Sequence, residues 1–312
     1  YFISTSDHNT SEQYFFKADE KKPKPKLIKK RKKGILYSVN SWDNKFYNHT
    51  NEEAEDFKIE ISESLENQKW KSFIKPKNEV LIGNCIFLKN WIIRSETSNA
   101  LDRLFVRHIS KDSEEELIIS DEKVCVPSIS LRQKDRNTDE VYIGYSSPKT
   151  PSRVYLYDLS KKTKKLVKEQ IIPSGHNPND YVVERIEFES HDGRLVPLTI
   201  TRHKKTKLDG SANLLLYGYG SYGNSMSPSF SSTRLSLIDR DIIWATAHIR
   251  GGMEKGMKWW KEGKLTNKKN TFEDYIFAAK YLIQNKYSSQ GKIIGMGGSA
   301  GGLLMGAVAV SY

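Results

Sequence analysis

The chain has 312 residues, a formal net charge of +12 and 37% hydrophobic residues, which suggests about two domains with cores of their own. No apolar run approaches the roughly 20 residues that a helix needs to cross a bilayer, so we expect no membrane partner. The two cysteines, Cys85 and Cys125, are far apart and belong to no C-x-x-C or Cys/His cluster. We therefore expect no metal and no cofactor, and a reducing, cytoplasmic compartment.

A dense basic block, Lys21 to Lys33, reads KKPKPKLIKKRKK. A nucleic-acid surface is one interpretation, because clustered lysines attract phosphates. However, Pro23 and Pro25 interrupt any periodicity, no aromatic residue is interleaved, and lysine is abundant along the whole chain. The block therefore favours a solvated loop, and we expect no nucleic-acid partner.

The first part of the chain, residues 1–175, has the pattern of short β-strands throughout. Apolar and polar residues alternate in four representative segments that start roughly 40 to 50 residues apart, a period typical of four-stranded propeller blades: residues 14–16, 57–61, 104–109 and 154–159. The sequence predicts a partial β-propeller of about three to four blades, and a β-sandwich remains the alternative.

A breaker-rich segment, residues 172–180, predicts a boundary, after which residues 176–312 read as α/β. Strands are expected at residues 181–189 and 195–201 around an Asp-Gly turn, and again at 213–217 and 241–249. Residues 271–286 form an amphipathic helical pattern, for which Thr271 is the expected N-cap. Strands that alternate with helices predict a parallel sheet.

The chain leads to the segment Lys292 to Val310, KIIGMGGSAGGLLMGAVAV. Residues 293–296 read as a short buried strand and residues 303–310 as a buried helix, with glycines on both sides of Ser299 between them. Strand, G-x-S-x-G and helix in this order predict a nucleophile elbow, in which the serine hydroxyl stands at the top of the sheet. The backbone N–H of Ala300 would then start the helix and point at a developing oxyanion.

Two structural alternatives exist for this segment. A glycine-rich turn without chemistry is one, since glycine and serine are common in loops. A phosphate-binding loop is the other, but that motif requires a lysine after its last glycine, and Leu303 follows Gly302 here.

Four segments in this order carry a resemblance: YGYGSYG at 217–223, HIRGG at 248–252, NTFEDYIFAAKYLI at 270–283 and GGSAGG at 297–302. The chain resembles the prolyl oligopeptidase family of serine peptidases, and within it the oligopeptidase B branch. The resemblance implies an α/β-hydrolase domain preceded by a β-propeller, an activity on short peptides, and cleavage after basic residues.

By the same resemblance, Ser299 is the nucleophile, and Ala300 supplies one oxyanion donor through its backbone N–H. Tyr219, whose bland interpretation is a packing residue at a strand end, supplies the second donor through its hydroxyl. Arg250 matches a position near the site, which we interpret as structural. Met253 and Lys255 depart from the family pattern, where a glycine and an apolar or aromatic residue are usual.

A serine needs a base to take its proton, and in this fold the order along the chain is Ser, Asp, His. The 13 residues after Ser299 contain no Asp, Glu or His, and all seven histidines precede it. His248 is the nearest in sequence, and a packing role is expected for it. We therefore expect a central fragment of a larger enzyme, inactive alone, which comes from a split or decayed gene or is excerpted from a longer sequence. A second hypothesis is that a separate C-terminal polypeptide supplies the Asp and His. A non-catalytic propeller-type scaffold, an esterase and an acylaminoacyl peptidase are the alternatives.

Overall fold

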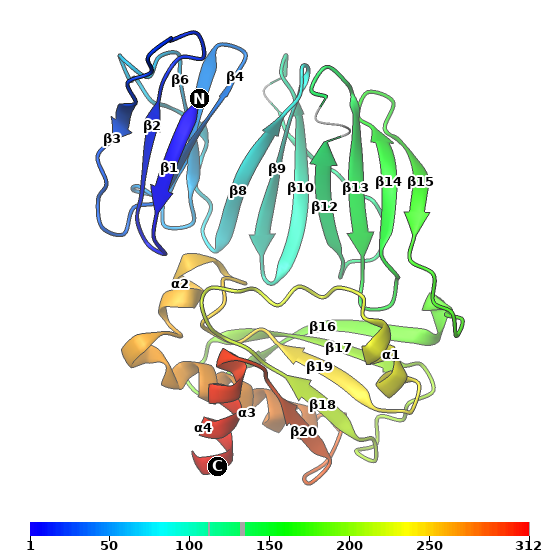
Figure 1. Cartoon of the computed structure of the whole chain (residues 1–312). Coiled ribbons are helices and arrows are strands. Elements are labelled where there is room, and N and C mark those ends of the chain that lie inside the picture. The colour runs from blue at the N-terminus through cyan, green and yellow to red at the C-terminus, as the bar shows by residue number, and fades with distance from the viewer. Residues whose placement is uncertain (112, 132–134, 312) are drawn as a thin grey trace.

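The computed structural model describes residues 1–111, 113–131 and 135–311. Four antiparallel sheets stand side by side over the first part of the chain (Figure 1). Their strands are β1 (Phe2–Ser6), β2 (Ser11–Phe15) and β3 (Lys26–Lys29); β4 (Tyr37–Trp42), β5 (Lys45–Thr50), β6 (Lys58–Ser62) and β7 (Lys71–Ile74); β8 (Val80–Phe87), β9 (Trp91–Ser98), β10 (Leu101–His108) and β11 (Glu115–Glu116); and β12 (Val126–Leu131), β13 (Glu140–Ser146), β14 (Arg153–Asp158) and β15 (Thr163–Glu169). In each sheet, strands adjacent in sequence are also adjacent in space, as in propeller blades and unlike the two facing sheets of a sandwich.

Alternating side chains explain why these strands stack as blades. Along β13, Val141, Ile143 and Tyr145 are buried on one face, because successive residues of a strand point to opposite sides. They pack against buried residues of the preceding blade, including Ile93 and Leu104. The outermost strand β15 is exposed along its whole length, and its lysines discourage pairing with another chain.

A five-stranded mixed sheet lies below the blades in Figure 1. Its order is β16-β17-β19-β18-β20, with β16 (Tyr181–Glu189), β17 (Leu195–His203), β18 (Leu214–Tyr217), β19 (Ile243–Ala247) and β20 (Ile293–Met296). The sheet is parallel, as predicted, at β19, β18 and β20, and β16 and β17 form the antiparallel hairpin that the Asp-Gly turn indicates. The tight turn between β16 and β17 forces this direction, since parallel neighbours need a crossover. The parallel pattern does not extend to β17 and β19, which pair antiparallel.

The helices of this part are α1 (Ser232–Ile238), α2 (Gly256–Lys261), α3 (Lys269–Gln284) and α4 (Ala300–Ser311), with short 3-10 turns η1 (Pro178–Asp180) and η2 (Leu265–Asn267). Helix α3 packs Tyr275, Ala278 and Leu282 onto the sheet core. The prediction that Thr271 is the N-cap of this helix is wrong, because the helix begins at Lys269 and its N-cap residue is Lys268. The hydroxyl of Thr271 instead donates to the carbonyls of Arg250 and Gly263 at 2.8 and 3.1 Å.

The strand β20 and the helix α4 are less buried than their apolar sequences predict. Ile294 and Met296 are 55% and 46% exposed, and Leu303 on α4 is 59% exposed. The reason is that β20 pairs only with β18 among the described strands, so its other edge lies open. Leu304 points inward and is fully buried.

The blades contact the mixed sheet's helices through polar groups. The buried carboxylate of Asp56, between β5 and β6, accepts the N–H of Met257 at 2.6 Å, in the first turn of α2. Glu55 pairs with Lys261 at 2.6 Å at the other end of the same helix. Because α2 has no side-chain cap from its own N-cap residue, the second blade supplies the acceptor that the helix terminus requires.

Candidate active site

Ser299 sits between β20 and α4, in the strand–turn–helix context that the sequence predicts. Its φ is 54°, a left-handed conformation that is uncommon for any residue other than glycine. The residue is exposed, and α4 begins directly after it at Ala300. The first N–H groups of a helix have no intrahelical acceptor and lie at the positive end of its dipole. The N–H groups of Gly301 and Gly302 donate to the carbonyls of Gly298 and Ser299 at 2.8 and 2.9 Å, which leaves the N–H of Ala300 as the backbone donor next to the hydroxyl of Ser299.

Glycines around Ser299 allow the strand, the helix and a second loop to approach one another closely. A Cβ on Gly297 would lie 2.5 Å from the carbonyl oxygen of Gly301 and 3.0 Å from that of Gly218. A Cβ on Gly301 would lie 2.9 Å from the same Gly218 oxygen. No side chain fits in these spaces, so glycine is required at both positions.

Tyr219 follows β18 and lies beside α4, the helix that begins directly after Ser299. The strands β18 and β20 are parallel neighbours, and the N–H of Gly218 extends their pairing by donating to Met296 at 3.1 Å. The half-buried ring of Tyr219 would be 3.5 Å from a Cβ on Gly301. The structure thus brings Ser299, Ala300 and Tyr219 to the same end of the sheet.

Comparison with known proteins agrees with this architecture. The prolyl oligopeptidase N-terminal β-propeller domain matches residues 1–170, and the prolyl oligopeptidase family model matches residues 228–312. This chain belongs to the prolyl oligopeptidase family. The family resemblance noted from the motifs is confirmed, as is the fold of an incomplete α/β-hydrolase preceded by propeller blades.

Curated family members are similar over nearly the whole chain. Protease 2 of Moraxella lacunata is 32% identical over 99% of this chain, and dipeptidyl aminopeptidase BI of Pseudoxanthomonas mexicana is 35% identical over 90%. The matched regions are 44% and 39% of these relatives, so the chain spans about two fifths of their length. These relatives and the family to which they belong are peptidases.

Solved oligopeptidases share the same architecture. Oligopeptidase B from Trypanosoma brucei, in a closed form with covalently bound antipain, superposes with a TM-score of 0.91 at 28% identity, over 98% of this chain and 45% of that one. Oligopeptidase B from Leishmania major gives a TM-score of 0.88 at 27% identity, over 98% and 44%.

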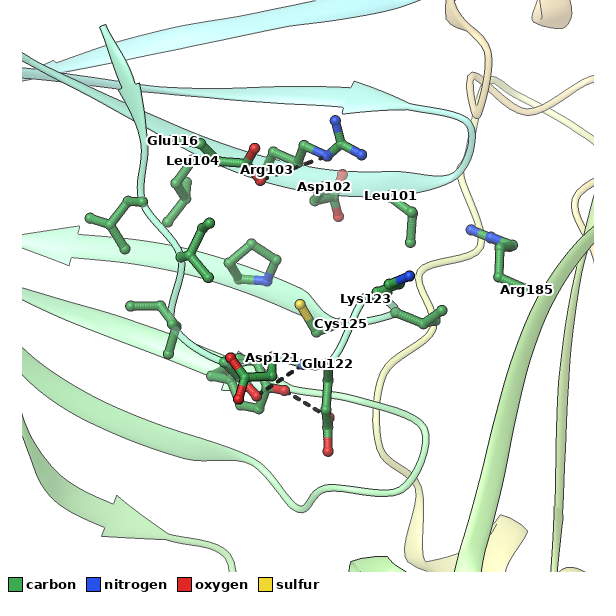
Figure 2. A pocket seen from close by; sticks show the side chains of 17 residues that line it. Leu101, Asp102, Arg103, Leu104, Glu116, Asp121, Glu122, Lys123, Cys125 and Arg185 are labelled. Atoms are coloured by element: carbon green, nitrogen blue, oxygen red, sulfur yellow. Dashed lines mark hydrogen bonds and ion pairs between the residues drawn. The ribbon is translucent and has the colours of Figure 1, made fainter.

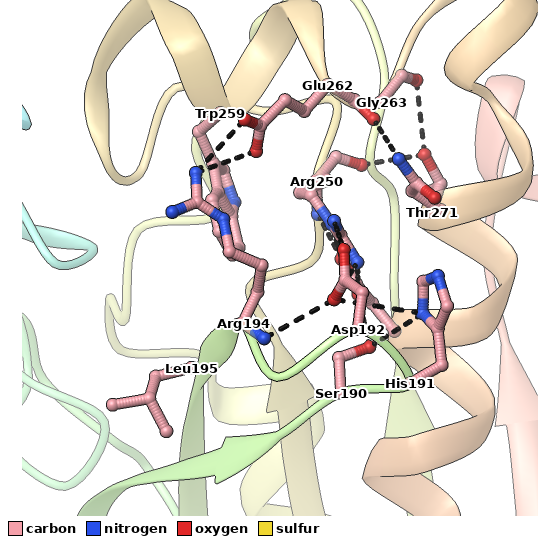
Figure 3. A network of polar contacts seen from close by, with 12 residues as sticks. Ser190, His191, Asp192, Arg194, Leu195, Arg250, Trp259, Glu262, Gly263 and Thr271 are labelled. Carbon is pink, nitrogen blue, oxygen red and sulfur yellow. Dashed lines mark hydrogen bonds and ion pairs between the residues drawn. The ribbon is translucent and has the colours of Figure 1, made fainter.

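The buried guanidinium of Arg250 joins three elements near Ser299 and Tyr219. Arg250, which is 1% exposed, donates to Asp274 through its backbone N–H, Nε and Nη2 at 3.0, 2.9 and 2.6 Å. Its Nη1 donates to Asp192 at 2.5 Å, in the β16–β17 turn (Figure 3). Burial disfavours the charge of Arg250, but these hydrogen bonds outweigh burial and raise its pKa. Arg250 thus joins the β16–β17 turn, the loop after β19 and helix α3, which agrees with the structural interpretation.

The loop of Tyr219 rests on the residues next to Arg250. The missing side chain of Gly251 leaves room for the carbonyl oxygen of Gly220, 1.9 Å from where a Cβ would be. The amine of Lys268 donates to the same carbonyl and, at 2.8 Å, to the hydroxyl of Ser221. Burial lowers the pKa of Lys268 to about 8. The sequence analysis did not single out Lys268, since one lysine in a lysine-rich segment carries no signal.

In the described part of the chain, no hydrogen bond joins the hydroxyl of Ser299 to a His, Asp or Glu side chain, and the histidines have other partners. His248 is fully buried, and its Nε2 lies 2.7 Å from the hydroxyl of Thr199. His176 lies 2.6 Å from the carbonyl of Lys149. No cluster of His, Cys, Asp and Glu suited to a metal is found among the described residues. None of the helices described is long and apolar enough to cross a membrane.

We expect Gly297→Ala to destabilise the protein by about 1–3 kcal/mol, because its methyl group would meet backbone carbonyls that cannot rotate away. Gly298→Ala is the matched control in the same turn, since nothing lies within 4 Å of its Cβ position. Urea unfolding midpoints of the two variants provide the comparison. Equal midpoints would show that the close approach does not constrain the turn.

We expect Asp274→Asn to lower the free energy of unfolding by about 3–5 kcal/mol, because it leaves the buried guanidinium of Arg250 undercompensated. Asp180→Asn is the control, since Asp180 pairs with Lys204 on the surface, and it should leave the midpoint almost unchanged. Thermal and urea unfolding measure both variants. An Asp274→Asn variant as stable as the control would contradict the role assigned to this pair.

Proposed function

We propose that the chain is part of a serine-type oligopeptidase, with residues 1–175 as its propeller portion and 176–312 as its hydrolase portion. Ser299 would attack the scissile carbonyl and form an acyl-enzyme. The N–H of Ala300 and the hydroxyl of Tyr219 would donate to the oxyanion. The observation that carries this proposal is the positive φ of Ser299 at the start of α4, beside Tyr219.

The proposed substrates are short peptides, cleaved after basic residues. The support is the similarity to Protease 2 and to oligopeptidase B structures, together with the motifs at residues 217–223 and 297–302. A cytoplasmic location is also proposed, for which the support is that both cysteines in the structure are free.

We propose further that the general base and its orienting acid lie outside residues 1–312, in a further part of the hydrolase domain that belongs either to the same protein or to a separate C-terminal polypeptide. The residues after Ser299 contain no Asp, Glu or His. The open edge of β20 and the exposed side chains of Ile294, Met296 and Leu303 offer an apolar surface on which further strands and helices of a hydrolase domain would pack. Without that base, the hydroxyl of Ser299 stays protonated and is a weak nucleophile.

The purified chain should not react stoichiometrically with a fluorophosphonate probe, because nucleophile and base act as a unit and losing one costs several orders of magnitude in rate. Intact-mass spectrometry after incubation measures this, with a complete serine oligopeptidase as the positive control. One adduct per chain that maps to Ser299, and that disappears in Ser299→Ala, would refute the dependence on an external base.

A second experiment tests the identity of the nucleophile. The chain is mixed with the C-terminal hydrolase segment of Protease 2 from Moraxella lacunata, and association is verified by co-purification. We expect the complex to hydrolyse an arginine amide peptide, and Ser299→Ala to abolish turnover while binding persists. A Ser299→Ala complex with unchanged turnover would exclude Ser299 as the nucleophile. Binding without turnover in both complexes would favour the non-catalytic scaffold.

A further inference from the structure

The third blade contacts the mixed sheet through its β9–β10 turn. The turn residues Asn99 and Ala100 both have positive φ, 48° and 58°, as the two central residues of a tight type I′ hairpin turn do. The N–H of Ala100 donates to the carbonyl of Glu254 at 2.8 Å. In return, Nη2 of Arg185 on β16 donates to the carbonyls of Asn99 and Ala100 at 3.1 and 2.7 Å. The turn itself is therefore held by one side chain, that of Arg185, and by backbone groups. Beside it, the hydroxyl of Ser227 donates to Asp102 of β10 at 3.5 Å.

Behind this contact lies a cluster of buried polar side chains. Arg185 donates through Nη1 to the hydroxyl of Thr199 at 2.5 Å, and that hydroxyl lies 2.7 Å from Nε2 of His248. One carboxylate oxygen of Glu254 accepts the N–H of Met226 at 3.0 Å. His248 and Glu254 are 0% and 1% exposed. The cluster thus joins the blade contact to the loop that follows Tyr219.

The cluster contains several buried polar atoms that have no hydrogen-bond partner in the described part of the chain. Four of the eight buried side-chain atoms without a protein partner among the described residues belong to it: Asn99 Oδ1, Arg185 Nε, His248 Nδ1 and Glu254 Oε2. Such concentrations are unusual, since buried polar atoms are nearly always paired. A cavity of about 650 Å³, lined in part by Asp102 and Arg185, adjoins the contact (Figure 2). The contact therefore lies next to space that water can occupy.

Charged and titratable side chains of both signs surround the carboxylate of Glu254. Arg185 faces it from β16, Asp102 from β10, and Nδ1 of His248 lies 4.0 Å from its carboxylate. Burial, which outweighs the hydrogen bond from Met226 and the charge of Arg185, raises the pKa of Glu254 to about 7. Burial and the charge of Arg185 hold the pKa of His248 well below its usual value. Burial lowers the pKa of Arg185 to about 10, against the charges of Glu254 and Glu187. Glu254 is thus the group of this cluster that changes charge near neutrality.

We propose that Arg185, His248 and Glu254 form a pH-dependent latch that holds the third blade on the mixed sheet and releases it as the pH rises through neutrality. In the docked form Glu254 is protonated and uncharged, which suits its burial. Release admits water to the carboxylate and returns its pKa toward the ordinary glutamate value of 4.5. At a pH between these two pKa values of Glu254, the docked form binds more protons than the released form. Docking is therefore favoured at mildly acidic pH and weakens as the pH rises. The latch does not depend on the role proposed for Ser299.

Hydrogen–deuterium exchange of this chain at pH 5.5 and 8.5, corrected for intrinsic exchange rates, tests the latch. Protection of peptides spanning residues 97–104 should fall by at least about tenfold at the higher pH, since each unit of pKa change corresponds to a factor of ten. In Glu254→Gln, whose amide oxygen can still accept from Met226, the two pH values should differ less than threefold, by the same argument. Arg185→Gln should lose protection of this turn at both pH values.

Glu262→Gln is the matched control, because Glu262 pairs with Arg194 away from the blades and should keep the wild-type pH dependence. Peptides of β17 report on global unfolding and should stay protected in every variant. The proposal fails if the wild type shows no pH dependence in residues 97–104 or if Glu254→Gln retains it. It also fails if β17 loses protection in parallel, because the change would then be global.

Discussion

Backbone contact between glycines sets the geometry around Ser299. Gly297 and Gly301 both face the carbonyl oxygen of Gly218 at distances that exclude a Cβ, so β20, α4 and the loop after β18 meet without side chains between them. The left-handed Ser299 and the half-buried Tyr219 are placed by this one contact. The apolar core beneath it, in which Leu216 and Leu304 are fully buried, supplies the packing that holds a strained turn closed.

Buried ion pairs of Arg250 connect the glycine contact to neighbouring elements of the protein. Apolar side chains in place of a buried ion pair often leave a protein equally stable. The burial of Arg250 and Asp274 is therefore weak evidence that this pair adds to the free energy of unfolding. The pair instead fixes the orientation of the Arg250 side chain. Three donors of Arg250 bind Asp274 on α3, and its Nη1 binds Asp192 in the β16–β17 turn. The next residue, Gly251, then abuts Gly220 in the loop of Tyr219. Elements far apart in sequence are thereby held in one relative position.

Features encoded by neighbouring residues could be predicted from the sequence, and those that depend on distant partners could not. The turn at Ser299 and the β16–β17 hairpin follow from local glycine and Asp-Gly patterns. Thr271 looked like an N-cap because its local pattern fits one, yet its hydroxyl bonds carbonyls of a different loop. The contact between Asp56 and Met257 joins residues 201 positions apart, and no local pattern announces it. The exposure of Ile294 likewise depends on which strands lie beside β20.

Two buried carboxylates near the contacts between the blades and the rest of the protein, those of Asp56 and Glu254, are satisfied to different degrees. Both oxygens of Asp56 accept backbone N–H groups, from Met257 at 2.6 Å and Glu79 at 3.1 Å. These bonds oppose the effect of burial, which nevertheless raises the pKa of Asp56. Glu254 has one oxygen without a protein partner. Hydrogen bonds from backbone donors stabilise the charged form of a carboxylate, whereas a buried carboxylate oxygen without a donor lacks this stabilisation. The second blade therefore makes the better satisfied of these two contacts.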